Sequence, residues 1–337
     1  MTLAFAKAVA LLQAGELVAF PTETVYGLGA DAANPEAVAK IFAAKGRPAD
    51  HPLIVHLAGA AYLDRWARDI PAAAWELAEA FWPGPLTLIL KRAPEVPYAV
   101  TGGQETVGVR VPAHPVALEL LRAYAQAGGG RDAMCGIAAP SANRFGRISP
   151  TDAVHVHEEL GDSVALVLDG GPCAVGIEST IIDLSRDDGL PPRLLRPGHI
   201  TPEQIAAVIC VMPVAPEASS GENAPRVSGS LDAHYAPLTP MRVVGTSELP
   251  GLLRELKTEN QSFGLLAYTP QGALVQAHSL RQLPGDAEGY ARGLYAALRE
   301  LDQVGNDVIV VEAIPEETSW TAVADRLRRA ACGSGNT

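Results

Sequence analysis

Positive charge is scarce in this sequence. Its 337 residues include 26 lysines and arginines against 38 aspartates and glutamates, which gives a formal net charge of −12. A broad nucleic-acid-binding surface usually requires a basic domain, so this balance argues against one. A local basic pocket stays compatible with it.

Cysteines are also few, and they are scattered. They are Cys135, Cys173, Cys210 and Cys332, and none belongs to a CxxC pair. This argues against a disulfide framework or a zinc site and favours reduced thiols in a cytosol. Residues 1–13 are too polar for a signal peptide, and no apolar run approaches the ~18 residues that suggest a membrane span. We therefore expect a cytoplasmic protein.

Two common nucleotide-binding motifs are missing. The sequence contains neither GxxxxGK[ST] nor a GxGxxG that opens a helix, so any ATP is held in another way. His155 and His157 lie two residues apart on a predicted helix and point to different sides of it. Because no ligand set with zinc spacing occurs, we interpret them as surface histidines and expect no metal ligands from the protein.

The chain is rich in apolar residues and in turn residues. Hydrophobic residues make up 48%, and the length is sufficient for two domains. A stretch rich in proline, serine and glycine, which includes Ser219-Ser220-Gly221, interrupts the hydrophobic periodicity after Met212 and predicts a linker. We therefore expect a first domain over 1–211, a linker over 212–237 and a small α/β domain over 238–337.

Hydrophobic periodicity and turn residues predict alternating helices and strands. Asn34 is the expected N-cap of one helix, with Pro35 at its first position, and Thr151 is the expected cap of another. The predicted helices cover 3–12, 35–42, 72–81, 115–127, 151–160, 248–257, 287–303 and 320–331. The predicted strands cover 17–20, 52–57, 86–90, 106–111, 137–139, 165–168, 179–182, 241–244, 263–268 and 307–311. The βαβ order after the linker predicts a parallel sheet.

Two short polar clusters indicate a site for a polyanion. Lys45-Gly46-Arg47-Pro48 follows a predicted helix, and Ser141-Ala142-Asn143 follows an apolar strand. Arginine can bind phosphate oxygens in a bidentate manner, while lysine acts as a compact point charge. The alternative is that Lys45 and Arg47 are solvated charges that suit the dipole of the helix end.

Arg110 ends a predicted apolar strand, where an unpaired guanidinium would be costly to bury. It should face an anion in a cavity or an acidic partner in a structural ion pair. The polar stretch from Pro21 to Leu28 also leaves a buried strand, the position that lines the ligand crevice of many α/β sheets. An ordinary hydroxyl-rich turn is the alternative.

Three further segments have both a functional and a plain structural interpretation. Ser149 precedes a predicted helix and suits either phosphate binding or capping. The segment Gly176-Ile177-Glu178-Ser179-Thr180 suits close backbone approach to a ligand or a simple turn. The same alternatives hold for Leu194-Leu195-Arg196-Pro197-Gly198.

Taken in order, these motifs resemble the L-threonylcarbamoyladenylate synthases in their long two-domain form. The resemblance covers nearly the whole chain, extends the motif around Arg110 and includes further motifs. These are His51-Pro52-Leu53, Trp82-Pro83-Gly84-Pro85, Val109-Arg110-Val111-Pro112, His234-Tyr235-Ala236-Pro237 and Asp325-Arg326-Leu327. It implies a YrdC-like domain, with a twisted mixed sheet around a concave cavity, followed by a small Rossmann-like domain.

The resemblance also implies an activity. The family makes threonylcarbamoyl-AMP and pyrophosphate from L-threonine, bicarbonate or CO2, and ATP accompanied by Mg²⁺. The product supplies the t6A modification at position 37 of tRNA, and separate proteins carry out the transfer to tRNA.

Site residues follow from the same resemblance. Lys45 and Arg47 would supply the catalytic charge. The nucleotide would be bound by Lys45, Arg47, Thr106, Ser141, Asn143, Ser149, Arg196 and Tyr235. L-Threonine would be bound by Thr22, His51, Arg110, the backbone of Ala139, and Ser179. The family's linker often contains Pro-Gly-Met before His-Tyr, whereas this chain has Ser228-Gly229-Ser230, so its linker lacks the stiffening proline.

Three other interpretations remain at this stage. A carbamoyl-transfer enzyme of hydrogenase maturation carries a related domain but adds CxxC pairs, which this sequence lacks. A double-stranded-RNA-binding module is opposed by the net charge of −12. A butanone-phosphate-synthase-like enzyme would need acidic metal ligands that are not evident around Lys45.

Overall fold

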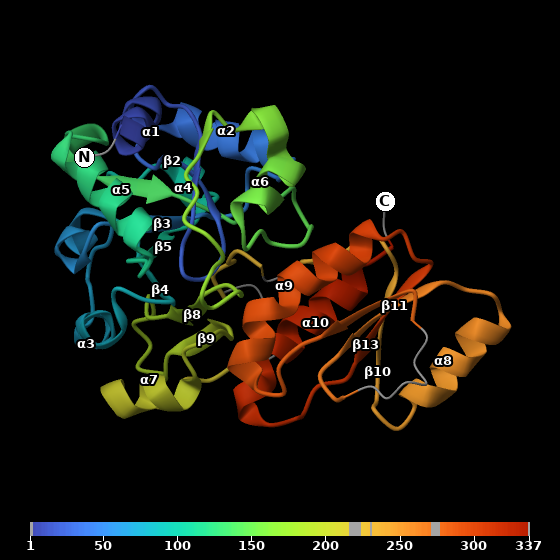
Figure 1. The fold of residues 1–337 in the computed structure, drawn as a ribbon. Coiled ribbons are helices and arrows are strands. Elements are labelled where there is room, and N and C mark those ends of the chain that lie inside the picture. Colours follow the sequence, from blue (N-terminus) through green and yellow to red (C-terminus); the bar gives the residue numbers. More distant parts are fainter. Residues whose placement is uncertain (1–2, 216–223, 230, 271–276, 336–337) are drawn as a thin grey trace. The chain divides into compact units, whose positions relative to one another are not determined.

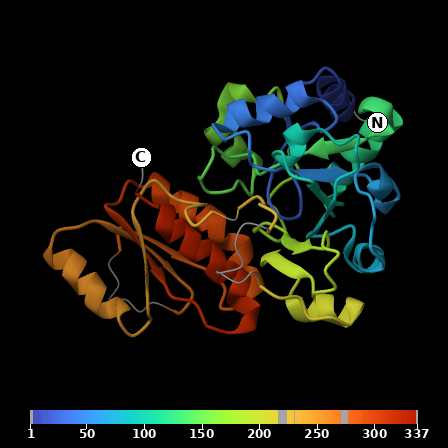
Figure 2. The ribbon, with the colours of Figure 1, turned by 180° about the vertical axis from the view of Figure 1, so that it is seen from behind.

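The computed structural model describes residues 3–215, 224–229, 231–270 and 277–335, so Ser219-Ser220-Gly221 and Ser230 of the predicted linker lie outside the described residues. The chain forms two compact units, coloured along the sequence in Figure 1 and seen from behind in Figure 2. The first unit comprises residues 1–144, 150–174 and 178–230, and the second comprises 145–149, 175–177 and 231–337. The domain boundaries expected from sequence stay a prediction.

The first unit is built on a nine-stranded mixed sheet. Its spatial order is β7-β1-β2-β6-β3-β5-β4-β8-β9. The strands are β1 (Val18–Phe20), β2 (Gly27–Asp31), β3 (Ile54–Leu57), β4 (Leu86–Lys91), β5 (Thr106–Arg110), β6 (Gly136–Ala138), β7 (Leu166–Val167), β8 (Thr180–Asp183) and β9 (Arg193–Arg196). Strands β3 and β5 are parallel, as are β4 and β8, while β4 and β5 are antiparallel. The mixed sheet predicted from the family resemblance is confirmed.

The two faces of this sheet have different surroundings. Successive side chains of a strand point to opposite faces, so β5 places Val107 and Val109 in the larger hydrophobic core. Gly108 and Arg110 therefore face the other side. On that side, Ile89 of β4 and Ile181 of β8 pack against the linker residue Val227. The candidate site lies on this second face.

Several α-helices pack on this sheet. The α-helices of the first unit are α1 (Leu3–Gln13), α2 (Pro35–Lys45), α3 (Ala72–Phe81), α4 (Tyr98–Thr101), α5 (Pro115–Gln126), α6 (Ala153–Leu160) and α7 (Pro202–Ile209). The Asn34 side chain accepts from the backbone N–H groups of Glu36 and Ala37, which confirms the predicted cap of α2. The predicted cap of α6 is wrong. Asp152 accepts from the Val154 N–H, because α6 begins two residues after Thr151.

The second unit contains the predicted parallel sheet. Its order is β10-β13-β11-β12, and every neighbouring pair is parallel. The elements are β10 (Met241–Val244), α8 (Leu249–Thr258), β11 (Phe263–Ala267), β12 (Ser279–Gln282), α9 (Ala287–Gln303), β13 (Val308–Glu312) and α10 (Thr321–Gly333). Leucines of α8 pack on one face, against Phe263, Leu265 and Val310. Leu301 of α9 lies beside Gly264 on the other face, so helices cover both sides (Figure 1).

Five of the helices and strands in the described residues were not predicted from the sequence, namely β2, β9, β12, α4 and α7. Glycine is depleted in strands, and β2 contains Gly27 and Gly29. A Cβ on Gly29 would lie 2.7 Å from the Phe20 ring and 2.9 Å from Ile137, so close packing of neighbouring strands requires glycine there. Helix α7 did carry a signal, because Thr201 and Gln204 form a capping box.

The remaining described elements are short. Four 3-10 turns cover Ala60–Arg65, Arg131–Ala133, Gly161–Ser163 and Thr318–Trp320. Within the described ranges, no helix is both long enough and apolar enough to cross a membrane.

Candidate functional site

The first of the two polar clusters contacts the second through Lys45. Its ammonium group donates hydrogen bonds to the backbone carbonyl oxygens of Ser141 and Asn143. Lys45 is the last residue of α2, and Gly46 follows it in the left-handed conformation, with φ 62°, which glycine adopts readily. The side chain is only 3% exposed, so the alternative of a solvated charge at a helix end is wrong for Lys45.

Burial also changes the acid–base behaviour of Lys45. Desolvation, together with the nearby Arg47 cation, lowers the pKa of the amine well below its usual value. Two backbone carbonyl oxygens accept from the ammonium group and offset part of that cost. The site therefore holds a fixed donor at the carbonyl end of the Ser141–Asn143 turn.

Arg47 and Arg196 both reach Ser228, on the segment that precedes the second unit in sequence. Arg47 donates through Nη1 to Ser228 Oγ at 3.4 Å and through Nη2 to the Pro52 carbonyl at 2.9 Å. Arg196 donates through Nη1 to the Ser228 carbonyl at 2.8 Å. Both guanidinium groups are buried. Two of the predicted nucleotide-binding cations thus lie against one short segment.

Arg196 also fixes Ser179, a predicted threonine-binding residue. Its Nε donates to the Ser179 carbonyl at 3.0 Å, and its Nη2 donates to the Ser179 hydroxyl at 3.1 Å. Arg196 lies at the end of β9, and Ser179 directly precedes β8, its antiparallel neighbour. The sheet therefore brings these two predicted site residues together.

Arg110 has an acidic partner, which is one of the two alternatives of the sequence argument. Its Nη2 lies 2.6 Å from Glu23 Oε1 in a buried ion pair. Its Nη1 donates to Thr24 Oγ1 at 2.9 Å, and Thr24 Oγ1 lies 2.8 Å from Thr22 Oγ1. The polar Pro21–Leu28 stretch is consequently tied to Arg110 through three of its side chains. That Arg110 also binds a threonine carboxylate stays a prediction.

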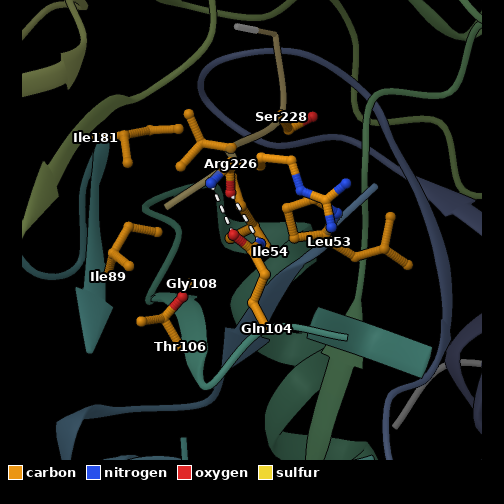
Figure 3. A pocket seen from close by; sticks show the side chains of 11 residues that line it. Leu53, Ile54, Ile89, Gln104, Thr106, Gly108, Ile181, Arg226 and Ser228 are labelled. Carbon is orange, nitrogen blue, oxygen red and sulfur yellow. Dashed lines mark hydrogen bonds between the residues drawn. The ribbon is translucent and has the colours of Figure 1, made fainter. Parts of the chain in front are cut away.

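A short linker segment lines a small cavity on this face of the sheet (Figure 3). The cavity is lined by Ile54, Ile89, Thr106, Gly108 and Ile181 together with Arg226, Val227 and Ser228. Thr106, a predicted nucleotide-binding residue, is thus placed on the cavity wall.

Gln104 holds this segment by its backbone. The Arg226 N–H donates to Gln104 Oε1 at 2.7 Å, and Gln104 Nε2 donates to the Arg226 carbonyl at 3.1 Å (Figure 3). The Arg226 side chain pairs with Asp50 at 3.0 Å and donates to the Gly102 carbonyl. Sequence reasoning missed Gln104, because an isolated glutamine gives no signal of a contact 122 residues away.

His51 and Ala139 are two further residues of the predicted threonine site. His51 is half-buried, and burial, followed by the Arg47 charge, lowers its pKa below the usual value. The Ala139 N–H donates to the Ile54 carbonyl at 3.0 Å. Their predicted contacts with L-threonine stay predictions.

Two predicted site residues, Ser149 and Tyr235, belong to the second unit. Ser149 is fully buried. Tyr235 has φ 61°, is 1% exposed, and lies against His234 with ring centroids 4.2 Å apart. The Arg326 guanidinium carbon lies 5.4 Å from the Tyr235 ring centroid, a cation–π arrangement. Their role on a nucleotide stays a prediction.

The histidine pair of α6 shows one local contact. His155 Nδ1 accepts from the Thr151 N–H at 3.3 Å. Among the residues that the structure describes, no three histidine, cysteine or carboxylate side chains gather as metal ligands would.

Comparison with known proteins identifies the family. A family described as "Telomere recombination" matches residues 10–198. A second, described as "Threonylcarbamoyl-AMP synthase, C-terminal domain", matches residues 200–332. The threonylcarbamoyl-AMP synthase of Pyrococcus abyssi is 41% identical over 96% of this chain and 92% of its own length. This chain belongs to the threonylcarbamoyl-AMP synthase family.

Other members of the family agree with this assignment. The threonylcarbamoyl-AMP synthase of Bacillus subtilis is 42% identical over 97% of this chain and 93% of its own. A crystal structure described as P. abyssi Sua5 complexed with L-threonine has a TM-score of 0.88 at 40% identity. It covers 98% of this chain and 94% of that one. The family's enzymes share both units of the fold, which confirms the fold expected from the resemblance.

Proposed function

We propose that this chain makes threonylcarbamoyl-AMP, the product that the names of its relatives state, together with pyrophosphate, from L-threonine, CO2 or bicarbonate, and ATP. One observation of the structure carries the site assignment. Lys45, Arg47 and Arg196 are buried cations attached to the Ser141–Asn143 turn and to Ser228, a charge arrangement suited to a polyphosphate.

The reaction needs positioning more than it needs a nucleophile from the protein. The threonine amine adds to CO2 and loses a proton, which gives a carbamate. A carbamate oxygen then attacks the α-phosphorus of ATP, the bond to the bridging oxygen breaks, and pyrophosphate leaves. Holding the reactants in line and neutralising charge on the phosphates supply the rate enhancement. Lys45 and Arg47 provide the fixed positive charge for this step.

The amino acid would lie on the polar network around Arg110. Thr22, Thr24 and Glu23 hold that guanidinium in place, and Ser179 is held by Arg196. The carboxylate of L-threonine is the anion that such donors suit. His51 and the Ala139 backbone complete the proposed threonine site. The P. abyssi relative, whose complex contains L-threonine, supports this substrate.

ATP would enter as its magnesium complex. Magnesium commonly keeps several waters and binds substrate phosphates, so it needs no dedicated cage of carboxylates. Thr106, Asn143, Ser149 and Tyr235 are the remaining proposed contacts of the nucleotide. A cytoplasmic location and transfer of the product to tRNA by separate proteins belong to the same proposal.

The test is threonine-dependent release of pyrophosphate from MgATP with bicarbonate present. Release should require L-threonine and bicarbonate together. Omission of either reactant serves as the control, and release that is equally fast without L-threonine would contradict the proposal.

A further inference from the structure

Thr87 lies beside Ser179, one of the proposed threonine-binding residues, and was not singled out from the sequence. It belongs to β4, is 0% exposed, and shares a face of that strand with Ile89, which lines the cavity. Its hydroxyl oxygen lies 2.8 Å from the Ser179 hydroxyl oxygen. Within the described residues, Ser179 is the one hydrogen-bond partner of that hydroxyl.

The direction of this hydrogen bond follows from Arg196. A guanidinium group can only donate, so Ser179 Oγ accepts from Arg196 Nη2 at 3.1 Å. Thr87 and Ser179 have one hydroxyl proton each. When a ligand oxygen accepts from Ser179, both protons are satisfied only in the order Thr87 to Ser179 to ligand. The reverse order would leave a buried Thr87 proton unpaired, which is costly.

We propose that Thr87 is a positioning residue that donates to Ser179 and thereby directs the Ser179 proton to an anionic oxygen of the substrate. This inference rests on the proposed function, in which that oxygen belongs to the carboxylate of L-threonine. Ser179 accepts two hydrogen bonds, from Thr87 and Arg196, and donates its own proton to the substrate. Such a chain of hydrogen bonds polarises its last member and strengthens that contact.

Thr87 could instead serve only to pack the core. Substitutions separate this packing role from the proposed role of its hydroxyl group. Thr87→Val keeps the branched shape, including the methyl that would lie 3.7 Å from a Cβ on Gly108, and removes only the hydroxyl. Thr87→Ser keeps the hydroxyl and removes the methyl. Thr87→Ala removes both, so it supplies a second variant without the hydroxyl if the valine does not fold.

The experiment compares these three variants with Ser179→Ala and the double variant Thr87→Val/Ser179→Ala in the full chain. Calorimetric binding of L-threonine and the KM values for L-threonine and ATP are measured. Loss of the Thr87 hydroxyl should weaken L-threonine binding and raise its KM about fivefold, the loss expected for one hydrogen bond, with little change in the KM for ATP. Thr87→Ser should restore most of the affinity. In the Ser179→Ala background, Thr87→Val should change nothing further.

Three results would overturn the inference. They are an unchanged affinity in Thr87→Val and Thr87→Ala, an equal loss in Thr87→Ser, or a full Thr87→Val effect in the absence of the Ser179 hydroxyl. The wild-type chain separates this inference from the proposed function. If the wild-type chain binds L-threonine but releases no pyrophosphate, only the proposed function is contradicted. If it binds no L-threonine, the proposed function and the Thr87 inference are both contradicted.

Discussion

Lys45 donates a hydrogen bond to the backbone carbonyl oxygen of Asn143, 98 residues further along the chain. This contact brings two separate sequence motifs together, and both belong to the proposed ATP site. Because the ammonium group is buried and already oriented, it needs little rearrangement when a phosphate arrives, which is the condition under which a fixed charge accelerates a reaction.

Removal of the Lys45 cation should therefore cost activity without unfolding the chain. Lys45→Ala is expected to lower threonine-dependent pyrophosphate release by about a hundredfold or more, the usual loss for one preorganised donor. The matched control is Lys40→Ala on the same helix, where the lysine is exposed and pairs with Glu16 at 2.9 Å. A Lys45→Ala variant that is folded and as active as Lys40→Ala would remove Lys45 from the site.

The buried ion pair between Glu23 and Arg110 should dominate the local stability of the first unit. Glu23→Gln removes one charge and leaves Arg110 buried without its counter-ion, so unfolding should become easier by about 3–5 kcal/mol. The exposed pair of Lys40 and Glu16 is the control, because Glu16→Gln should cost at most about 1 kcal/mol. Urea unfolding of the full chain measures both values. Equal small losses would show that Glu23 does not hold Arg110.

His56 should make the first unit sensitive to acid. Burial, followed by the nearby Arg110 charge, lowers the pKa of His56 from 6.5 to about 3. Between pH 6.5 and pH 3, His56 is protonated in the unfolded chain and neutral in the folded chain. Stability contributed by neutral His56 is thus complete above about pH 6.5 and is lost as the pH falls toward 3, with a slope of about 1.4 kcal/mol per pH unit.

The measurement is the free energy of unfolding as a function of pH. His56→Phe should flatten the curve between pH 6 and 4 by about one proton, whatever its effect at neutral pH. His157→Gln, a change at an exposed histidine of α6, should leave the slope as it is. An unchanged slope in His56→Phe would contradict the assignment of a neutral buried imidazole.

The two hydrogen bonds between the Gln104 side chain and the Arg226 backbone should protect this backbone from proteolysis. Trypsin cleaves after arginine only when the local chain detaches, so loss of these bonds in Gln104→Ala should speed cleavage after Arg226 about tenfold. The control is Gln13→Ala, which removes a comparable amide contact to the Ala127 carbonyl. Mass spectrometry identifies the cleaved bond, and equal rates in the two variants would contradict a Gln104 attachment.

Local signals in the sequence predict most of the helices and strands. Asn34-Pro35 gives the start of α2, and periodicity gives α3 and α9 with the bounds that the structure shows. Strand β2 was not predicted because it contains glycine. Gly29 is needed there for close packing against Phe20 and Ile137, which lie elsewhere in the sequence. The β-strand propensity of single residues contains no information about such a contact.

The sequence likewise indicates some residues of the candidate site and misses others. Lys45, Arg47 and Arg110 stand out because charge next to turn residues or inside an apolar strand is unusual and costly. Thr87 and Gln104 do not stand out, because each acts through a partner 92 or 122 residues away. Glu23 lies in the polar stretch that the sequence indicates, but its partner Arg110, 87 residues away, cannot be inferred from that stretch. Their roles become visible only when the sheet brings the partners together.

The most direct test of the whole account is mass-spectrometric detection of the product. The full chain is incubated with MgATP, L-threonine and ¹³C-labelled bicarbonate, and the mixture is quenched and analysed at once. The account predicts threonylcarbamoyl-AMP that carries the label in its carbamoyl carbon, formed together with pyrophosphate, and little of it with Lys45→Ala. Pyrophosphate release without any labelled threonylcarbamoyl-AMP would contradict the account.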